Sequence, residues 1–309
     1  MSDRDAEEPL LAIVGPTASG KSEVGLAVAE AIGAEIVSVD SMLVYRGMDV
    51  GTAKPSLAER ARVPHHLIDV ARPSEPFSVA RYRELAEAAV RGIRARGNRV
   101  LLVGGSGLYF RAVVDRLEFP GTDPGTRSML EAEAAALGPE RLHRRLAELD
   151  PAAAARIEPR NVRRTVRALE VAAVTGRPFS AFQAAWDRYE PGRVRAAGIE
   201  IPREVLAARI EARVRAMVAG GLLEEVRSLV AQGFGRWLTA SQAIGYAEFA
   251  RHLAGELTLE EAVASTVRRT RELARRQMVW FRRDPRIRWF RAGPEGAIAL
   301  VEELVEYLR

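Results

Sequence analysis

A glycine-rich phosphate-binding motif near the start of the chain constrains the fold more than any other feature. Residues 15–22 read GPTASGKS and satisfy G-x-x-x-x-G-K-[ST], directly after an apolar run and directly before a helical pattern. In such a loop the glycines let backbone amides converge on phosphate oxygens, and the following helix directs its positive end toward them. Lys21 adds a point charge, and Ser22 offers a hydroxyl to Mg²⁺. The motif predicts that a diphosphate or triphosphate binds to this loop.

The rest of the first third of the chain alternates short apolar runs with helical periodicity. Because parallel strands joined by helices pack as a sheet covered on its faces, we predict an α/β fold of the P-loop NTPase type, a parallel sheet flanked by helices. The predicted strands of this part are residues 10–15, 35–40, 66–70 and 99–104, and the predicted helices are 21–32 and 78–96. Later in the chain we predict strands at 198–201 and 286–290 and helices at 203–219, 222–232 and 295–308.

The chain changes character between residues 119 and 198, where alanine, arginine and proline are frequent and continuous β-like runs are few. We predict that 119–198 is a helical insertion domain. The α/β core would then be discontinuous and consist of 1–118 and 199–309.

Composition excludes several classes of protein. The 309 residues are 48% hydrophobic and 28% charged, which is typical of a globular chain, and no apolar run approaches the ~20 residues that span a membrane. The chain has no cysteine, which excludes disulfides, thiolate zinc sites and a cysteine nucleophile. We expect a cytoplasmic location, no membrane partner and a monomer, and the polar start of the chain does not resemble a signal peptide.

Two further strand ends are predicted to lie beside the phosphate loop. Asp40 ends the second predicted strand, at the crevice where open α/β sheets bind ligands. It could coordinate Mg²⁺ through water or accept a proton from a nucleophile, and a carboxylate that caps the next turn is the structural alternative. Residues 103–110 read VGGSGLYF and would present the Ser106 hydroxyl and backbone amides to the same cleft, although close backbone packing would also explain these glycines. Ser41 and Tyr45 are candidate hydrogen-bond donors, and packing is the alternative for Tyr45.

Arginine is concentrated in two stretches of the chain. Residues 141–171 contain eight arginines against four acids, and residues 268–288 contain nine against two. The second stretch belongs to a long helix predicted at 258–283, which begins at a capping box of Thr258 and Glu261. Few acids in the same helix could pair with these arginines, so we predict a surface for a polyanion, with an ordinary solvated face as the alternative.

The spacing of the arginines supports this prediction. Arginines with helical spacing that would share one face are Arg160, Arg163, Arg164 and Arg167 in the first stretch. In the second stretch two rows repeat every seven residues, Arg268, Arg275 and Arg282, and Arg269, Arg276 and Arg283. Gln277, Trp280 and Phe281 are interleaved with these rows, and the two aromatic residues could equally belong to the apolar side.

Lysine is rare, because Lys21 and Lys54 are the only lysines among 46 Lys and Arg residues. The phosphate-binding motif explains Lys21. For Lys54 a specific role and chance survival are both open.

Several motifs, in order and at compatible spacing, resemble those of the bacterial tRNA dimethylallyltransferases, also called isopentenyl-diphosphate:tRNA transferases. The motifs are GPTASGKS, DSMLVYRGMDVGTAKP, VGGSGLYF, RALEV and RELARRQMVWFRR, and the similarity extends from about residue 10 to residue 283. The resemblance implies transfer of a dimethylallyl group from dimethylallyl diphosphate to N6 of the adenosine 3′-adjacent to the anticodon of a tRNA. It also implies Mg²⁺ as cofactor and the tRNA anticodon stem-loop as partner.

The resemblance further implies roles for particular residues. The diphosphate-binding residues would be Gly15, Pro16, Thr17, Ala18, Ser19, Gly20, Lys21 and Ser22, with Ser22 as the magnesium ligand. Asp40 would be the general base, and Lys21, Ser106 and Arg213 would also be catalytic. Arg209 lies one turn from Arg213 and is the alternative second cation on the diphosphate. The tRNA contacts would be Asp40, Ser41, Met42, Leu43, Ser106, Arg127, Arg163, Arg164, Thr165, Val166, Arg167, Gln242, Ala243, Ile244, Gly245, Tyr246, Ala247, Arg275, Arg276, Gln277, Met278, Val279, Trp280, Phe281 and Arg282.

Two other functions are compatible with parts of the sequence. A P-loop kinase of a small metabolite would explain the phosphate loop but would leave the basic stretches without a role. A non-catalytic RNA-binding NTPase switch would explain the basic stretches but would give Asp40 no specific task.

Overall fold

The computed structural model describes residues 8–183, 186, 188–293 and 296–309. The chain forms two compact units. The larger unit consists of Met1–Arg116 and Glu190–Arg309, and the smaller unit consists of Leu117–Tyr189.

A parallel sheet is the centre of the larger unit. Its strands are β1 (Leu10–Val14), β2 (Ala34–Val39), β3 (His65–His66), β4 (Arg99–Gly104), β5 (Val194–Glu200) and β6 (Ile287–Arg291). Within the described residues they form one sheet with the order β3-β2-β4-β1-β5-β6, and every neighbouring pair is parallel. The fold class predicted from the sequence is confirmed.

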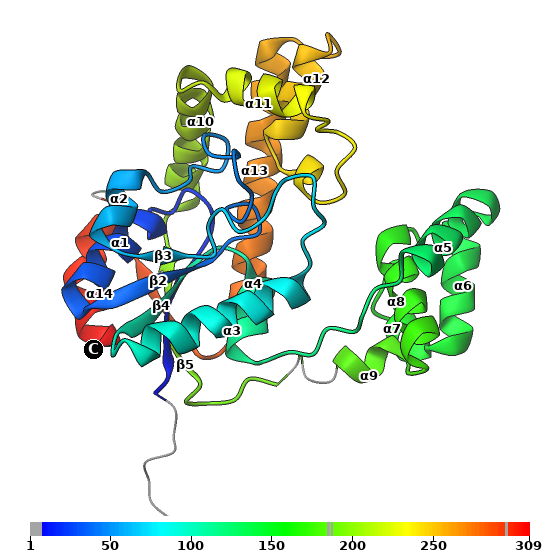
Figure 1. The fold of residues 1–309 in the computed structure, drawn as a ribbon, viewed down its shortest axis with the longest axis horizontal. Coiled ribbons are helices and arrows are strands. Elements are labelled where there is room, and N and C mark those ends of the chain that lie inside the picture. Colours follow the sequence, from blue (N-terminus) through cyan, green and yellow to red (C-terminus); the bar gives the residue numbers. More distant parts are fainter. Residues whose placement is uncertain (1–7, 184–185, 187, 294–295) are drawn as a thin grey trace, which may run out of the picture. The chain divides into compact units, whose positions relative to one another are not determined.

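Helices cover both faces of this sheet (Figure 1). The helical segments of the larger unit are α1 (Lys21–Ile32), α2 (Leu57–Arg62), α3 (Val79–Ala95), α4 (Gly107–Val114), α10 (Arg203–Ala219), α11 (Leu222–Ala231), η2 (Ala240–Gln242), α12 (Tyr246–Leu253), α13 (Leu259–Phe281), η3 (Ala297–Leu300) and α14 (Val301–Leu308). Side chains alternate along β1: Leu11 and Ile13 pack in the core with α1 and α14, whereas Ala12 and Val14 pack in the core with α3, α4 and α13. Because both faces are buried, the strands read as continuous apolar runs.

The long basic helix forms as the sequence predicts. In α13, Thr258 is the N-cap: its hydroxyl accepts from the amide of Glu261, and the Glu261 carboxylate accepts from the Thr258 amide. On its apolar side, Phe281 packs edge-to-face against Phe110 of α4, with ring centroids 5.9 Å apart. The helix is thereby fixed beside the turn that follows β4.

The predicted strand at 66–70 is wrong, because β3 contains only His65 and His66. Leu67 and Asp69 have φ angles of 64° and 59°, which a strand cannot contain. The Asp69 carboxylate is held in this turn by Lys54 and Arg60, at 2.6 and 2.8 Å.

Two other boundaries also differ from the prediction. Strand β5 begins at Val194 rather than at residue 198, because Leu10 to Val14 pair in register with Val194 to Gly198. The predicted end of the insertion at 198 therefore falls inside the sheet. The predicted helix at 295–308 is a turn of 3₁₀ helix, η3, followed by α14, and its first residue lies outside the described residues.

The smaller unit is helical. Its helices are α5 (Pro124–Leu137), α6 (Pro139–Leu149), α7 (Pro151–Ala154), α8 (Val162–Thr175) and α9 (Phe179–Gln183). They enclose a core of their own, with Leu130, Leu142, Leu146 and Leu169 among its buried members. Across both units, none of the described helices has the length and apolar character needed to cross a membrane.

Candidate active site

A cavity of about 390 Å³ lies at the carboxyl ends of β1, β2 and β4 in the larger unit. The loops after these strands, one face of α10, the segment 242–246 and α13 line it. This is the edge of an open parallel sheet at which ligands bind. The predicted site residues that line the cavity are Thr17, Lys21, Asp40, Ser41, Met42, Ser106, Arg213, Gln242, Ala243, Ile244, Gly245, Tyr246, Arg276 and Gln277.

The phosphate loop brings a buried ammonium to the cavity. Gly20, the residue before α1, has a φ of 89°, which glycine adopts without steric cost. The Lys21 side chain is buried behind it, and its Nζ donates to the carbonyl of Pro16 at 3.0 Å. Burial, together with the positive charge of Arg213 and against the attraction of Asp40, lowers the pKa of the Lys21 ammonium to about 8. Because burial leaves this ammonium poorly solvated, an anionic ligand beside it would strongly stabilise its charged form.

Among residues 15–22, only Thr17 and Lys21 are part of the cavity wall. Gly15, Pro16 and Ser19 are buried, and a side chain at Gly15 would place its Cβ 2.9 Å from the carbonyl oxygen of Ile199 on β5. Ala18 and Gly20 are half-buried, and Ser22 is exposed in the first turn of α1.

The half-buried Arg213 of α10 faces the same cavity. Arg213 donates to the carbonyl of Thr52 at 3.3 Å, and burial lowers its pKa while the charge of Asp40 opposes this shift. Arg209, the alternative, lies instead against the backbone of Gly20 and Gly296 and is not part of the cavity wall. The structure therefore brings Arg213, and not Arg209, together with Lys21 and Asp40.

The carboxylate of Asp40 both caps the turn after β2 and lines the cavity. Its Oδ1 accepts from the amides of Met42 at 2.8 Å and Leu43 at 3.4 Å, so the capping interaction considered as an alternative is present. The residue also lines the cavity and interacts electrostatically with both Lys21 and Arg213. The turn therefore fixes one carboxylate oxygen, and the side chain remains at the cavity wall.

The turn after β4 supplies a hydroxyl and is held close to its neighbours. Ser106 is the N-cap of α4, and its Oγ accepts from the amide of Tyr109 at 3.4 Å. A side chain at Gly104 would overlap the carbonyl of Val39, so close backbone packing, the alternative explanation, accounts for this glycine. Ser106 itself lines the cavity.

Gln277 of α13 connects the two glycine-rich turns. Its Oε1 accepts from the amide of Thr17 at 2.8 Å, and its Nε2 donates to the carbonyl of Gly105 at 3.0 Å. The side-chain amide therefore holds the phosphate loop, the turn after β4 and the basic helix in one arrangement.

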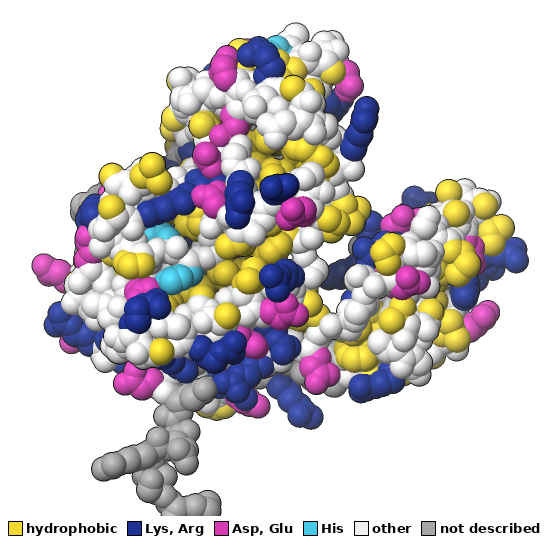
Figure 2. Space-filling view, viewed as in Figure 1, with side chains coloured by type: hydrophobic (Ala, Val, Ile, Leu, Met, Phe, Trp, Pro, Cys, Tyr) yellow, Lys and Arg dark blue, Asp and Glu magenta, His cyan; other side chains and the backbone are white. Residues whose placement is uncertain are grey.

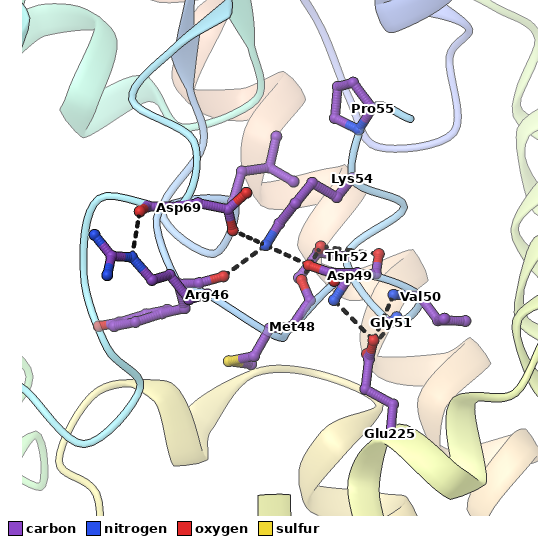
Figure 3. Close-up of polar contacts among 12 residues, drawn as sticks. Arg46, Met48, Asp49, Val50, Gly51, Thr52, Lys54, Pro55, Asp69 and Glu225 are labelled. Carbon is purple, nitrogen blue, oxygen red and sulfur yellow. Dashed lines mark hydrogen bonds and ion pairs between the residues drawn. The ribbon is translucent and has the colours of Figure 1, made fainter. Parts of the chain in front are cut away.

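Lys54 has a structural role, which resolves the question left open by the sequence. Its side chain is 2% exposed, and its Nζ lies 2.6 Å from the Tyr45 carbonyl and from the carboxylates of Asp49 and Asp69 (Figure 3). Tyr45 is itself buried, and its hydroxyl donates to Thr239 at 2.5 Å. Lys54 therefore fixes the loop after β2 and does not reach the cavity.

The acids that pair with the α13 arginines come from neighbouring elements and not from the helix itself. Arg282 pairs with Glu200 of β5 at 2.5 Å, Arg271 pairs with Glu211 of α10 at 3.3 Å, and Arg269 pairs with Glu248 of α12. Among the described residues no ion pair is recorded for Arg275, Arg276 or Arg283, and all three are exposed. On the face of the larger unit drawn in Figure 2, basic side chains likewise lie among acidic ones.

Several of the residues predicted to contact tRNA are buried in the structure. Phe281, Thr165 and Val166 are buried because they lie on the apolar faces of α13 and α8. Ala243, Gly245 and Tyr246 are also buried, although they line the cavity. Trp280 is half-buried against the backbone of Gly107, so for both aromatic residues the apolar alternative holds. The remaining positions outside the cavity wall are Leu43, Ala247 and Met278, half-buried, and Arg275, Val279 and Arg282, exposed.

In the smaller unit two of the predicted arginines, Arg127 and Arg167, bind a buried carboxylate. Glu170 accepts from Arg127 and Arg167, both at 2.7 Å, and from the amide of Asp123 at 3.0 Å. Arg163 and Arg164 are exposed. Arg160 does not share their face as predicted, because α8 begins after it, with Asn161 as the N-cap.

Part of the cavity wall was not predicted from the sequence. The missed residues are Gly51, Thr52, Ile210, Val214, Met217, Leu222, Thr266, Arg269, Thr270 and Leu273, with Gly105 noted only as part of its turn. Residues 210, 214 and 217 follow a helical spacing next to Arg213, which is the signal that could have indicated the apolar part of the wall.

Comparisons with known proteins agree on one family. The model of the IPP transferase family matches residues 43–284. The chain is similar to the tRNA dimethylallyltransferase of Kineococcus radiotolerans, with 53% identity over 97% of this chain and 96% of the relative. Among solved structures it is similar to the tRNA isopentenylpyrophosphate transferase of Bacillus halodurans, with 40% identity, a TM-score of 0.71, and coverage of 97% of this chain and 95% of the other. It is also similar to the corresponding transferase of Staphylococcus epidermidis, with 33% identity, a TM-score of 0.68, and coverage of 97% and 99%.

The chain belongs to the IPP transferase family. The resemblance that its motifs indicate is therefore confirmed, and with it the expectation of a tRNA-modifying prenyltransferase rather than a small-molecule kinase or a non-catalytic switch. The roles of individual residues stay predictions.

Proposed function

We propose that the chain transfers the dimethylallyl group of dimethylallyl diphosphate to N6 of the adenosine 3′-adjacent to the anticodon of tRNA and releases diphosphate. The observation that carries this proposal is the cavity in which two cations, the buried Lys21 and the half-buried Arg213, lie with the carboxylate of Asp40. The cations suit a diphosphate leaving group, and the carboxylate suits a proton acceptor for the attacking nitrogen.

The leaving group sets the main chemical demand. The exocyclic amine of adenine is a weak nucleophile because its lone pair is delocalised into the ring, so the bond between C1 of the allyl group and the diphosphate oxygen is largely broken before the bond to N6 forms. Negative charge then develops on the diphosphate. The loop amides, the Lys21 ammonium and the Arg213 guanidinium would stabilise that charge as it appears, in a cavity where water competes little.

Asp40 would complete the reaction as the base. As N6 bonds to C1, the N6 proton becomes acidic and passes to the carboxylate, and the products are N6-dimethylallyladenosine and diphosphate. The amides of Met42 and Leu43 hold Oδ1, so the carboxylate keeps its orientation through the transfer. Ser106, at the same wall, would donate its hydroxyl to a substrate oxygen or nitrogen.

Mg²⁺ fits the proposed site as a partner of the diphosphate. Ser22 offers an exposed hydroxyl in the first turn of α1, and Mg²⁺ commonly takes few protein oxygens together with phosphate oxygens and water. When bound, the ion would neutralise part of the charge on the departing diphosphate.

The RNA partner must bring N6 to the cavity. We propose that the target adenosine leaves the stacked anticodon loop, at a cost of a few kcal/mol that contacts to the RNA backbone offset. The exposed Arg275 and Arg276 of α13 and the exposed Arg163 and Arg164 of α8 are the proposed backbone contacts. A cytoplasmic location, a monomeric state and contact of the smaller unit with the anticodon stem-loop stay predictions.

One experiment separates the candidate activities. Purified protein is incubated with unmodified tRNA and either dimethylallyl diphosphate labelled in the allyl group or ATP labelled in the γ-phosphate. The proposal expects allyl label in the RNA, at N6 of one adenosine after nuclease digestion, and no phosphoryl transfer. ATP hydrolysis or phosphoryl transfer without allyl transfer would contradict it.

A further inference from the structure

Three consecutive backbone amides in the loop after β2 converge on one carboxylate. Glu225 of α11 accepts from the amides of Asp49 and Val50, both at 2.9 Å, through Oε2, and from the amide of Gly51 at 3.2 Å through Oε1 (Figure 3). Successive amides that point to one place form a concave anion site, and here the chain fills that site with its own side chain. The loop conformation at 49–51 therefore depends on the Glu225 carboxylate.

The same carboxylate holds a second segment of the cavity wall. The hydroxyl of Tyr246 in α12 donates to Oε1 of Glu225 at 2.5 Å. The Tyr246 ring also packs against the loop so closely that a Cβ at Gly51 would lie 2.5 Å from it. Because Gly51 and Tyr246 both line the cavity, Glu225 fixes two parts of the wall from outside it.

The loop that Glu225 holds ends at Thr52, whose carbonyl is the hydrogen-bond acceptor of Arg213. The carbonyl of Thr52 accepts from the Arg213 guanidinium at 3.3 Å, which is the one hydrogen bond recorded for that side chain among the described residues. The Thr52 hydroxyl in turn donates to the Met48 carbonyl at 2.6 Å, so residues 48–52 form one rigid turn. A shift of this turn would move the oxygen that orients Arg213.

We infer that Glu225 is a positioning residue, which holds residues 49–52 so that the Thr52 carbonyl directs the Arg213 guanidinium toward the diphosphate. This inference rests on the proposed function, because it takes the diphosphate as the ligand of Arg213. Glu225 does not touch the substrate. Its effect on the reaction passes through the loop and Arg213.

The test is a double-mutant cycle on prenyl transfer to an anticodon stem-loop RNA at saturating RNA. Glu225→Ala removes the acceptor of all four hydrogen bonds, and Glu225→Gln keeps the shape but leaves one oxygen to accept. The neighbouring Glu224→Ala is the matched control, because Glu224 is exposed on the same helix and pairs only with Arg227 among the contacts recorded for it. Each variant is made alone and with Arg213→Ala.

The expected results follow from action through Arg213. Arg213→Ala should lower kcat/KM for dimethylallyl diphosphate about 100-fold, as the loss of one charged donor to a leaving group does. Glu225→Ala should lower it about 10-fold or more, Glu225→Gln should lie between it and the wild type, and Glu224→Ala should leave it unchanged. In the Arg213→Ala background, Glu225→Ala should add less than about a 3-fold further loss.

Two outcomes overturn the inference. If Glu225→Ala and Glu225→Gln lower kcat/KM by the same factor with and without Arg213, Glu225 contributes only general stability, and a lower Tm should accompany the loss. If the soluble Glu225→Gln variant and the wild type have equal kcat/KM and equal KM for the diphosphate, the loop needs no carboxylate. A wild-type protein that transfers no allyl group would contradict the proposed function itself, and the inference with it.

Discussion

The cations of the cavity and the cations of helix α13 differ in what surrounds them. Lys21 is buried and Arg213 is half-buried, and the hydrogen bonds recorded for them among the described residues go to the neutral carbonyls of Pro16 and Thr52. On α13, by contrast, Arg282 is 58% exposed and pairs directly with Glu200.

This difference shows where positive charge is available to a ligand. A cation that is shielded from water and hydrogen-bonded only to carbonyls has lost favourable hydration free energy, and an anionic ligand compensates for that loss. An exposed arginine in an ion pair is already compensated and must exchange a carboxylate for a phosphate, which gains little. The count of arginines along a helix therefore overstates its affinity for RNA, whereas two cations of low exposure at one cavity, Lys21 and Arg213, define a site.

The largest effect is expected from the carboxylate that shares the cavity with these cations. Asp40→Asn keeps an oxygen for the amides of Met42 and Leu43 but cannot take the N6 proton, so kcat should fall by about 10²- to 10⁴-fold. RNA affinity, measured by fluorescence anisotropy, and the KM for dimethylallyl diphosphate should change little. Near-normal turnover would remove Asp40 from the mechanism.

The next effect is a pH dependence that only a buried cation produces. The pKa of Lys21 is lowered to about 8, so its ammonium is charged well below that pH and neutral well above it. Since the charged form binds the diphosphate, the contribution of Lys21 to pyrophosphate affinity should be full well below pH 8 and fall by up to about ten-fold per pH unit above it. Titration calorimetry of the wild type and of Lys21→Met checks this, because the variant should bind more weakly and without this pH dependence. An identical pH dependence in Lys21→Met would assign it to another group.

The smallest expected effect is a difference in tRNA affinity between variants of two α13 arginines, Arg275, for which no ion pair is recorded among the described residues, and Arg282, which pairs with Glu200. Arg275→Gln should lower tRNA affinity and reduce the slope of log affinity against log salt by about 1, as expected for one lost phosphate contact. Arg282→Gln should change both less, because Arg282 must first leave Glu200. Glu200→Gln should tighten tRNA binding slightly, and only when Arg282 is present. Equal effects of Arg275→Gln and Arg282→Gln would show that pairing with Glu200 does not matter.

The sequence predicts what local physics determines. The phosphate loop, the strand ends that carry Asp40 and Ser106, and the capping box of α13 all follow from patterns a few residues long. The turn at Leu67 and Asp69 could not be predicted in this way, because distant side chains, among them Lys54, hold it against the β-like pattern of its residues. The ion pairs of α13 depend on acids from β5, α10 and α12. The hydrogen bonds between Glu225 and the amides of residues 49–51 join segments about 175 residues apart. Only the tertiary structure brings these groups together.

The most direct test of the account is a structure of the protein with an anticodon stem-loop RNA and a non-hydrolysable analogue of dimethylallyl diphosphate. We expect the diphosphate to lie between the phosphate loop and Arg213 and the target adenine to be turned out of the RNA stack. The adenine N6 should lie about 3–3.5 Å from C1 of the allyl group, with Asp40 in hydrogen-bond reach of N6. An adenine that stays stacked, or an allyl carbon directed away from it with the diphosphate in the same loop, would contradict the account.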